Sequence, residues 1–466
     1  MSKHSEEEPL DLVGVGIGPF NLSLAALADG LPGLRTAFLE QSTAFRWHAG
    51  MMIEGATLQV PFLADLVSLV DPTSRWSFLN YMRHRERLFP FYFAERFHIQ
   101  RIEYDAYCRW VSEQLPACRF GHVVNTVRWD TARRAFDVDF TRVGADGEAQ
   151  GVGQLSARHL VLGVGTAPHV PEHLRPLVDD ETEPVWHSAE YLAHRDELLS
   201  ADHVTVVGSG QSGAEVFLDL LRRRPVGREG LAWIARTPAF APMEYSKLGL
   251  EQFTPDYTRY FQGLAEPVRD RLLPQQWQLY KGVSAETLGD IQDELYRRSL
   301  DDTWPDVMLT PGIDLRSVGR SGGRLELKFS HLQQASHGTL ATDGLVLATG
   351  YTERSVTTLT ESMAPHIRKD AGGRPQIDEA YRLVLGEPVE GSVFVQNAER
   401  HSHGVGAPDL GLAAWRSAVI LNALTGDQAY PLPSRTAFTT FGIDGTWHAP
   451  GGAMVSSGVS SGAVPG

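Results

Sequence analysis

The sequence predicts an α/β protein built on two copies of one β-α-β arrangement. An apolar run at residues 10–15 passes through the glycine turn GVGIGPF into a helical pattern, and a second strand follows at 36–40. The same order recurs from residue 204, where VTVVGSGQSGAEVFLDLL precedes a strand at 231–235. A stretch at 248–300 has helical spacing. We therefore expect two Rossmann-like dinucleotide-binding domains and a small, mostly helical region.

Composition and charge narrow the classes of function. The chain has 466 residues, 42% of them hydrophobic, which is enough for two or three globular domains. Its formal charge of −15 argues against a nucleic-acid-binding surface and is compatible with a cationic small substrate. The N-terminus, MSKHSEEEPLDL, is acidic where a signal peptide is basic and apolar, and no apolar run is long enough to span a membrane. We expect a cytoplasmic protein that binds neither nucleic acid nor membrane.

The first glycine loop has the features of a dinucleotide site. Gly14, Gly16 and Gly18 stand where a strand leads into a helix, so bare backbone amides can approach a pyrophosphate at the helix N-terminus. Pro19 takes the place of the third glycine in the usual G-x-G-x-x-G spacing. Glu40 ends the next strand, where a carboxylate would accept from a ribose hydroxyl. The alternative is a tight turn without a ligand, and the loop and the acid together favour the dinucleotide.

The second loop fits the full spacing, with Gly208, Gly210 and Gly213 in GSGQSG. The strand after it ends in Ala235-Arg236 and carries no acid. Arg236 can pair with a ribose 2′-phosphate, and the missing carboxylate removes a repulsion, so the loop favours NADPH over NADH. A solvated strand end is the alternative interpretation of Arg236.

Two such loops in one chain are the layout of flavoprotein oxidoreductases, in which a reduced nicotinamide feeds a bound flavin. We assign FAD to the first loop and NADPH to the second. Disulfide reductases share this layout but need a redox cysteine pair beside the flavin. The two cysteines, Cys108 and Cys118, form neither a CxxC pair nor a Cys/His cluster with metal-ligand spacing. We therefore expect an oxygen-using enzyme without a metal site.

These patterns divide the chain into four parts. Residues 1–187 are expected to form the first part of the FAD-binding domain. Residues 188–340 are expected to form the NADPH-binding domain, with a helical substrate-binding segment at about 241–300. Residues 341–445 are expected to return to the FAD-binding domain and to bring a C-terminal helix to the substrate. The tail at 446–466 is rich in Gly and Ser and is expected to be disordered.

Several phrases resemble, in order, the siderophore-pathway N-hydroxylating flavin monooxygenases that act on lysine, ornithine or diamines. They are GVGIGPFNLSLA, LQVPFLADLVSLVDPTSRWSFLNYM, EYDAYCRW, VVGSGQSGAEVFLDLL, ATGY and HGVGAPDLGLAAWRSA. The resemblance implies a cycle in which NADPH reduces FAD, oxygen adds to the reduced flavin, and the flavin hydroperoxide passes its distal oxygen to a neutral amine. It also implies a homo-oligomer, a tetramer by analogy.

The resemblance also gives roles to single residues. Gln59, in the LQVPFLADL block, would lie near the flavin and help to position the reacting groups; a polar residue capping a helix is the alternative. Gln211 and Ser212 would follow the nicotinamide pyrophosphate. The ATGY strand end would close over the flavin or the domain junction. It consists of Thr349, Gly350 and Tyr351 after an alanine.

Two departures from the family bear on the substrate. In the amino-acid hydroxylases a lysine in an FLKDL block pairs with the substrate α-carboxylate, and here that position is Ala64. The family's NE-x-F-x-P segment has an asparagine that touches the amino-acid end in some members, and here it is Leu250. A buried carboxylate without a cation costs several kcal/mol, so a diamine fits better than lysine or ornithine. We expect cadaverine first and putrescine second, and lysine N6-hydroxylation with a rearranged carboxylate site is the alternative.

The distal ammonium of a diamine needs acceptors. Glu244, Glu251, Asp65 or backbone carbonyls could serve, although such acids are often solvated helix faces. Leu410 and Gly411, in the HGVGAPDLGL block, are expected substrate contacts. The reacting amine must be deprotonated, so activity should rise with pH. Ketone or sulfide oxygenation, and a flavin-fold binding module without activity, are the other classes that share the two loops.

Overall fold

The computed structural model describes residues 8–300, 303–426 and 428–443, and its first sheet is built around the first glycine loop. Parallel strands lie in the order β3-β2-β1-β6, and β17 pairs with the C-terminal end of β6. The N-terminal part of β6 extends beyond them and pairs antiparallel with β5, which pairs with β4. The strands are β1 (Leu10–Val15), β2 (Thr36–Glu40), β3 (Cys118–Phe120), β4 (His122–Asp130), β5 (Ala135–Val143), β6 (Ala149–Leu162) and β17 (Val393–Val395).

The second sheet is parallel throughout, in the order β11-β10-β9-β15-β8. An antiparallel meander of β12, β13 and β14 follows β11 along the chain. These strands are β8 (Val185–His187), β9 (Val204–Val207), β10 (Leu231–Ala235), β11 (Val307–Pro311), β12 (Ile313–Ser321), β13 (Arg324–His331), β14 (Ser336–Thr342) and β15 (Gly344–Leu347). Two sheets built on parallel strands, each with its own glycine loop, confirm the expected α/β fold with two Rossmann-like units.

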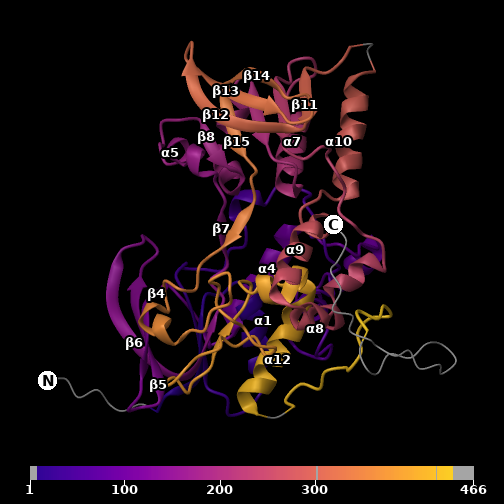
Figure 1. The fold of residues 1–466 in the computed structure, drawn as a ribbon. Helices are drawn as coiled ribbons and strands as arrows, with labels where there is room; N and C mark the ends of the chain where they lie inside the picture. The colour runs from indigo at the N-terminus through magenta and orange to yellow at the C-terminus, as the bar shows by residue number, and fades with distance from the viewer. Residues whose placement is uncertain (1–7, 301–302, 427, 444–466) are drawn as a thin grey trace.

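The chain crosses between the units twice, and the two crossings pair with one another. β7 (Thr166–Pro168) and β16 (Tyr351–Glu353) form an antiparallel ribbon. Figure 1 shows β7 between the two sheets, with β12–β15 at one end of the molecule and β4–β6 at the other. The second unit therefore begins after β7 and ends before β16, so it extends beyond the boundaries expected at 187/188 and 340/341. Both β8 and β15 lie in the second sheet, because the sheet in which a short apolar strand lies depends on long-range pairing that its local pattern does not encode.

Helices surround both sheets, and the helical region predicted at 248–300 is present. Its helices α8 and α9 pack against α11 of the first unit, beside α12 (Figure 1), whereas α10 packs on α7 of the second. The α-helices are α1 (Pro19–Ala28), α2 (Phe78–His84), α3 (Leu88–Ala94), α4 (Arg101–Gln114), α5 (Arg175–Val178), α6 (Tyr191–Ser200), α7 (Gln211–Arg223), α8 (Pro255–Gly263), α9 (Glu266–Gln275), α10 (Ala285–Arg298), α11 (Arg400–His403) and α12 (Ala413–Thr425). The 3-10 helices are η1 (Ala49–Met51), η2 (Glu172–Leu174), η3 (Ser188–Glu190), η4 (Gly249–Phe253), η5 (Trp277–Leu279), η6 (Glu361–His366), η7 (Gly404–Gly406) and η8 (Leu410–Leu412).

Helix α12 lies along α1 and runs in the same direction. The Arg416 guanidinium stacks over the Phe20 ring near the start of both helices, with its carbon 4.7 Å from the ring centre. One residue further along α12 and three further along α1, the Ser417 hydroxyl donates to the Ser23 hydroxyl at 3.0 Å. Beyond the end of α12, the Tyr430 hydroxyl donates to the carbonyl of Leu27. The N-terminal end of α12 therefore lies at the same end as the first glycine loop.

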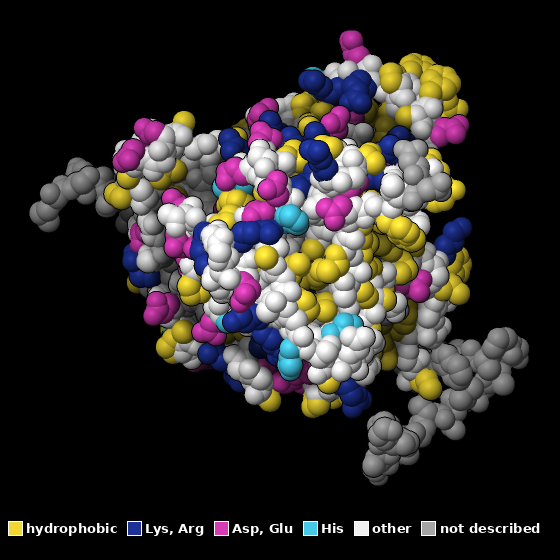
Figure 2. Space-filling model, turned by 90° about the horizontal axis from the view of Figure 1, so that it is seen from above, with side chains coloured by type: hydrophobic (Ala, Val, Ile, Leu, Met, Phe, Trp, Pro, Cys, Tyr) yellow, Lys and Arg dark blue, Asp and Glu magenta, His cyan; other side chains and the backbone are white. Residues whose placement is uncertain are grey.

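The surface and the ends of the chain bear on the expected partners. On the face in Figure 2, Lys and Arg side chains are interspersed with Asp and Glu. Within the described ranges, no helix is long and apolar enough to cross a membrane. The tail expected to be disordered, at 446–466, lies outside the described residues.

Candidate functional site

The first glycine loop is shaped by close backbone contacts on one side and open space on the other. Gly16 has a φ of 88°, and a Cβ there would collide with the carbonyl oxygen of Gly163. Gly14 lies within β1, and a Cβ there would overlap the Phe38 ring. At Gly18 a Cβ would meet nothing within 4 Å. The backbone at Gly18 thus opens a cradle at the start of α1, which fits a dinucleotide pyrophosphate.

The second loop has the same shape in the other unit. Gly208 has a φ of 135°, and a Cβ there would collide with the carbonyl oxygen of Ala348. Gly210 caps α7 in extended backbone, and the nearest atom to a Cβ there is the Lys281 carbonyl oxygen at 3.7 Å. A Cβ on Gly213 would collide with the carbonyl oxygen of Gly208. This glycine allows the first turn of α7 to approach the strand end closely.

The hydrogen bonds show which residues correspond between the loops. The Gly16 amide donates to Leu39 at 2.7 Å, as the Gly208 amide donates to Ile234 at 2.9 Å. Gly18, the N-cap of α1, has φ and ψ of −81° and 177°, against −87° and 178° for Gly210, the N-cap of α7.

This correspondence corrects one sequence interpretation. Counting from Gly16, the position of the third glycine holds Asn21, so Pro19 does not replace it. Pro19 is the first residue of α1, where its missing amide has no helical partner to lose. The side-chain amide of Asn21 donates to the carbonyls of Val15 at 3.1 Å and Gly16 at 2.8 Å. The G-x-G spacing from Gly14 gave the wrong register because Gly14 is required by Phe38, which lies on a neighbouring strand.

Glu40 and Gln59 are the two polar side chains that the sequence assigned to the flavin in the first unit. Glu40 ends β2, and its carboxylate accepts from the backbone amides of Ile17 and Ser42, both at 2.9 Å. The acid expected at the ribose therefore lies beside the glycine loop. The Gln59 side-chain nitrogen is buried and has no hydrogen-bond partner among the described residues. An unpaired buried amide donor costs about 1–3 kcal/mol, so this atom fits a ligand acceptor better than the alternative of a helix cap.

Residues around the second loop divide into structural and available groups. Gln211 ties α7 to α10, because its side-chain oxygen accepts from the Ser284 amide at 2.8 Å and its nitrogen donates to Glu215 at 2.8 Å. Ser212, in the first turn of α7, is half-buried. Arg236 follows β10, is exposed and has no ion-pair partner among the described residues.

A second cation lies close to Arg236 and was missed by the sequence interpretation. Burial lowers the pKa of Lys281, and the positive charges of Arg400 and Arg236 lower it further. Arg400 is already paired with Glu353 at 3.1 Å, which leaves Lys281 and Arg236 as two neighbouring cations whose repulsion a phosphate group would relieve. The chemistry of this donor set fits a 2′-phosphorylated nucleotide. A single lysine in the phrase YKGVS gives no local signal of this role.

The ATGY strand end lies at the domain junction. The Gly350 carbonyl accepts from the His187 ring at 3.0 Å, and the Thr349 hydroxyl donates to the carbonyl of His169. The Tyr351 ring contacts His48 and His187 edge-on, with centroids 5.4 and 5.3 Å away. The sequence left open whether this strand end closes over the flavin or the domain junction, and these contacts lie at the junction.

A buried ion pair crosses this junction. Arg101 at the start of α4 and Glu215 on α7 form two hydrogen bonds of 2.7 Å each. The side chains are 14% and 7% exposed, so water screens the pair weakly. It fixes the glycine-loop helix of the second unit against the first.

The expected substrate contacts come from three segments, and the structure brings most of them together. A Cβ on Gly411 would lie 4.0 Å from that of Ala64, so the PFLADL and PDLGL blocks are in contact. Leu410 packs against the core that contains α1. Leu250 lies on η4, which packs against η7 just before the PDLGL block. Glu244 is exposed, and its carboxylate accepts from the Ser246 amide at 2.6 Å.

Two of the acids considered for the substrate ammonium are occupied. Asp65 is buried and accepts from the backbone amides of Val67, Ser68 and Phe78 at 2.6–2.9 Å. Burial raises its pKa against these hydrogen bonds, and its role is to fix the loop before α2. Glu251 accepts from backbone amides of the C-terminal segment, at Phe438 and Thr439. The sequence interpretation did not single out Asp409, which precedes Leu410 and is discussed below.

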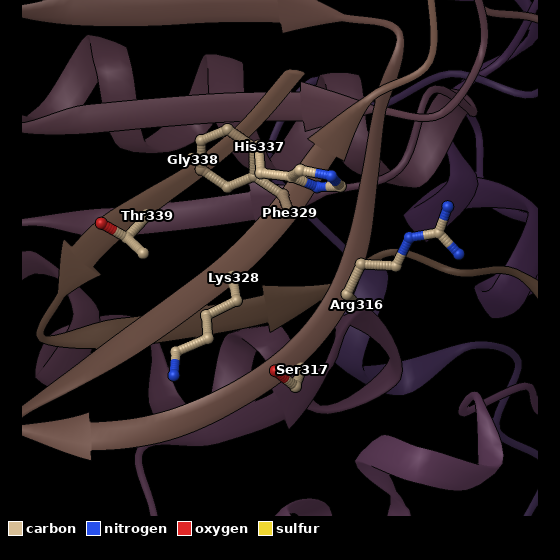
Figure 3. Close-up of a pocket in the computed structure, with 7 residues that line it drawn as sticks. All are labelled: Arg316, Ser317, Lys328, Phe329, His337, Gly338 and Thr339. Carbon is tan, nitrogen blue, oxygen red and sulfur yellow. The ribbon is translucent and has the colours of Figure 1, made fainter. Parts of the chain in front are cut away.

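A surface hollow lies away from these residues. It lies on the outer meander of the second unit, and Figure 3 shows its side chains, with Arg316 and Lys328 pointing away from one another. Arg316 pairs with Asp314 at 3.0 Å, so its charge is already neutralised. This hollow is lined by β12–β14 and by none of the glycine-loop residues. Among the described residues no group of His, Cys, Asp and Glu is arranged to hold a metal ion.

The fold and the site together define a class of protein. Two glycine loops, each at the strand ends of its own parallel sheet, are the arrangement of an oxidoreductase that brings two nucleotide cofactors together. Residues 8–353 match the sequence family described as L-lysine 6-monooxygenase/L-ornithine 5-monooxygenase. The chain belongs to this family and is a monooxygenase.

The chain is also similar to individual members of this family. It is 41% identical to the putrescine N-hydroxylase of Shewanella oneidensis, over 92% of this chain and 84% of that one. DfoA, the cadaverine monooxygenase of the desferrioxamine pathway of Erwinia amylovora, solved with FAD, is 38% identical with a TM-score of 0.87, covering 94% of this chain and 99% of DfoA. The ornithine N-hydroxylase KtzI of Kutzneria sp. 744, solved with reduced FAD, NADP+ and ornithine, is 26% identical with a TM-score of 0.82, covering 90% and 99%.

Proposed function

We propose that this enzyme hydroxylates one amine of a diamine for siderophore biosynthesis, with cadaverine the preferred substrate and putrescine the next. The observation that carries the proposal is the methyl group of Ala64, in contact with the PDLGL block where the family's amino-acid hydroxylases have a lysine. A substrate α-carboxylate buried here would have no cation from this position. The names of two relatives, a putrescine hydroxylase and a cadaverine monooxygenase, support the same substrate class.

FAD is assigned to the first unit and NADPH to the second. When bound, the reduced flavin supplies the oxygen-activating chemistry. The chain contributes the open backbone at Gly18, at the start of α1, for the pyrophosphate and the unpaired Gln59 side-chain amide as a hydrogen-bond donor. Arg236 pairs with the 2′-phosphate and selects NADPH. The protein also keeps water from the site and holds the reacting amine in its neutral form.

A substrate panel tests this function. Purified enzyme with FAD and NADPH is assayed with cadaverine, putrescine, lysine and ornithine, and both NADPH oxidation and hydroxylamine product are measured. We expect product from cadaverine first, then putrescine. Hydroxylamine formed only from lysine would overturn the proposal in favour of lysine N6-hydroxylation.

The variant Ala64→Lys tests the carboxylate argument directly. The added cation is expected to repel the diamine and to pair with an α-carboxylate. We expect cadaverine kcat/KM to fall about tenfold or more and lysine binding to improve. Unchanged values for both substrates would show that residue 64 does not face the substrate.

A further inference from the structure

Asp409 lies just before η8 and α12, in the segment that leads into α12. It caps η8, and its side-chain oxygen accepts from the Gly411 amide at 2.6 Å. Helix α12 follows directly and runs parallel to α1, so its N-terminal end lies at the glycine-loop end of the unit. The carboxylate is thus held on the side of the first unit where the dinucleotide cradle opens.

The segments that carry the substrate candidates surround this carboxylate. The Gly411 amide donates to Asp409, and a Cβ added at Gly411 would lie 4.0 Å from the methyl group of Ala64 in the PFLADL block. Tyr245, from the segment before η4, is close enough that the negative charge of Asp409 adds to burial in raising its pKa to about 12. Helix η4 itself, with Leu250, packs against η7, which ends three residues before Asp409. Three segments far apart in sequence therefore meet around one acid.

Asp409 has no ion-pair partner among the described residues. The positive charge of Arg416 acts on it, but Arg416 is already paired with Glu399 at 3.0 Å and donates to the Ala407 carbonyl at 2.7 Å. Burial raises the pKa of Asp409 to about 6, against its hydrogen bond to Gly411 and the charge of Arg416. A half-buried carboxylate without its own cation is costly in a folded protein, and a ligand cation relieves that cost.

We propose that the Asp409 carboxylate receives the distal ammonium of the diamine and makes the enzyme selective for substrates that carry a second positive charge. This rests on the diamine function proposed above. The same residue disfavours an amino acid, because an α-carboxylate beside Asp409 would add a like charge. Ala64 and Asp409 then act together: one position lacks the cation that an amino acid needs, and the other supplies the anion that a diamine needs.

The competing explanation is that Asp409 only caps η8, and the variant Asp409→Asn separates the two. The asparagine oxygen can still accept from the Gly411 amide, so the cap is retained while the charge is lost. The substrates compared are cadaverine and pentylamine, which has the same carbon chain and no second amine. We expect the cadaverine KM to rise about 10- to 100-fold with kcat changed far less, and pentylamine turnover to stay within about twofold.

Asp180→Asn is the matched control. Asp180 caps a turn by accepting from the Thr182 amide at 3.0 Å, in an exposed loop of the second unit. Its amide variant should leave both substrates unchanged. An unchanged ratio of cadaverine to pentylamine kcat/KM in Asp409→Asn, with FAD content and Tm preserved, would overturn the role of Asp409. If the wild type itself hydroxylates neither cadaverine nor putrescine, the proposed function fails, which is a different result.

A measurement on the wild type covers the case in which Asp409→Asn does not fold. The cadaverine-to-pentylamine ratio of kcat/KM is followed from pH 8 downward through about 6, the pKa of Asp409. Deprotonation of the reacting amine affects both substrates alike and cancels in the ratio, whereas protonation of Asp409 removes the anion that only cadaverine uses. Arg416 and Tyr245 are the charged and titratable groups that act on Asp409. Burial and the charge of Asp409 raise the pKa of Tyr245 to about 12, so its hydroxyl keeps its proton over this range. The ratio should fall about tenfold or more below pH 6, and a flat ratio would contradict the proposal.

Discussion

The two glycine loops perform the same turn with different residues at the third position. In the second unit Gly213 lets helix α7 approach the Gly208 carbonyl, which a Cβ would strike. In the first unit Asn21 stands at that position, and its amide donates to the corresponding carbonyl, that of Gly16, at 2.8 Å. The difference teaches that the motif requires close contact with this carbonyl, which either a missing side chain or a hydrogen-bonding one can provide.

The two units also differ in the polar side chains that they offer to a nucleotide. The first has an acid, Glu40, beside the loop and an unpaired amide at Gln59. The second has Arg236 and Lys281 and no acid at the end of β10. The backbone is common to both, so the side chains beyond it determine which dinucleotide each unit binds.

The largest expected effects come from the paired variants Gly16→Ala and Gly208→Ala. Each places a Cβ against a backbone carbonyl at a left-handed φ, which costs about 1–3 kcal/mol for the conformation alone. Gly16→Ala should lose FAD, measured as flavin absorbance per protein after purification. Gly208→Ala should keep FAD and lose reduction of the flavin by NADPH. Loss of flavin from both variants, or from neither, would show that the loops do not act separately.

A smaller effect is expected from Asn21→Gly, which gives the first loop the residue of the second. The carbonyls of Val15 and Gly16 lose their donor, and the side-chain amide of Gln396 loses its acceptor. Each group left unpaired costs about 1–3 kcal/mol of stability. Thermal unfolding with and without added FAD measures the loss. The reciprocal Gly213→Asn should instead disturb NADPH binding, and an unchanged Tm for Asn21→Gly would mean that the loop does not need the side chain.

The smallest expected effect is that of Arg236→Ala on nucleotide preference. Removing the guanidinium should reduce the ratio of kcat/KM for NADPH over NADH by about 10- to 100-fold and leave FAD content unchanged. Arg222→Ala, an exposed arginine of the same unit that pairs with Asp290, is the control. If the two variants behave alike, Arg236 is a solvated strand end.

The sequence predicted local elements well and the register of the loops less well. Strands β1, β2 and β10 have the predicted bounds, because apolar runs between turn residues identify strands without knowledge of their partners. The prediction took Gly14 as the first glycine of the first loop, but position 14 needs a glycine because a Cβ there would overlap the Phe38 ring on another strand. That requirement is a tertiary contact and leaves no trace in the spacing.

The substrate side was harder for the same reason. Ala64 and Gly411 were singled out separately from the family phrases, and only the fold brings them into contact. Asp65 and Glu251 were considered as free acids, and both are occupied by backbone amides. Asp409 lies in the HGVGAPDLGLAAWRSA block, but the sequence does not show that its carboxylate is partly buried and has no ion-pair partner among the described residues.

A competition assay tests the central claim most directly. Equal concentrations of cadaverine and lysine are mixed in one reaction with the FAD-loaded enzyme and NADPH, and the two hydroxylamine products are separated and measured. Their ratio equals the ratio of the two kcat/KM values. The arrangement of Ala64 within the PFLADL and PDLGL contact predicts that hydroxylated cadaverine dominates by about tenfold or more. A mixture dominated by hydroxylated lysine would contradict the account.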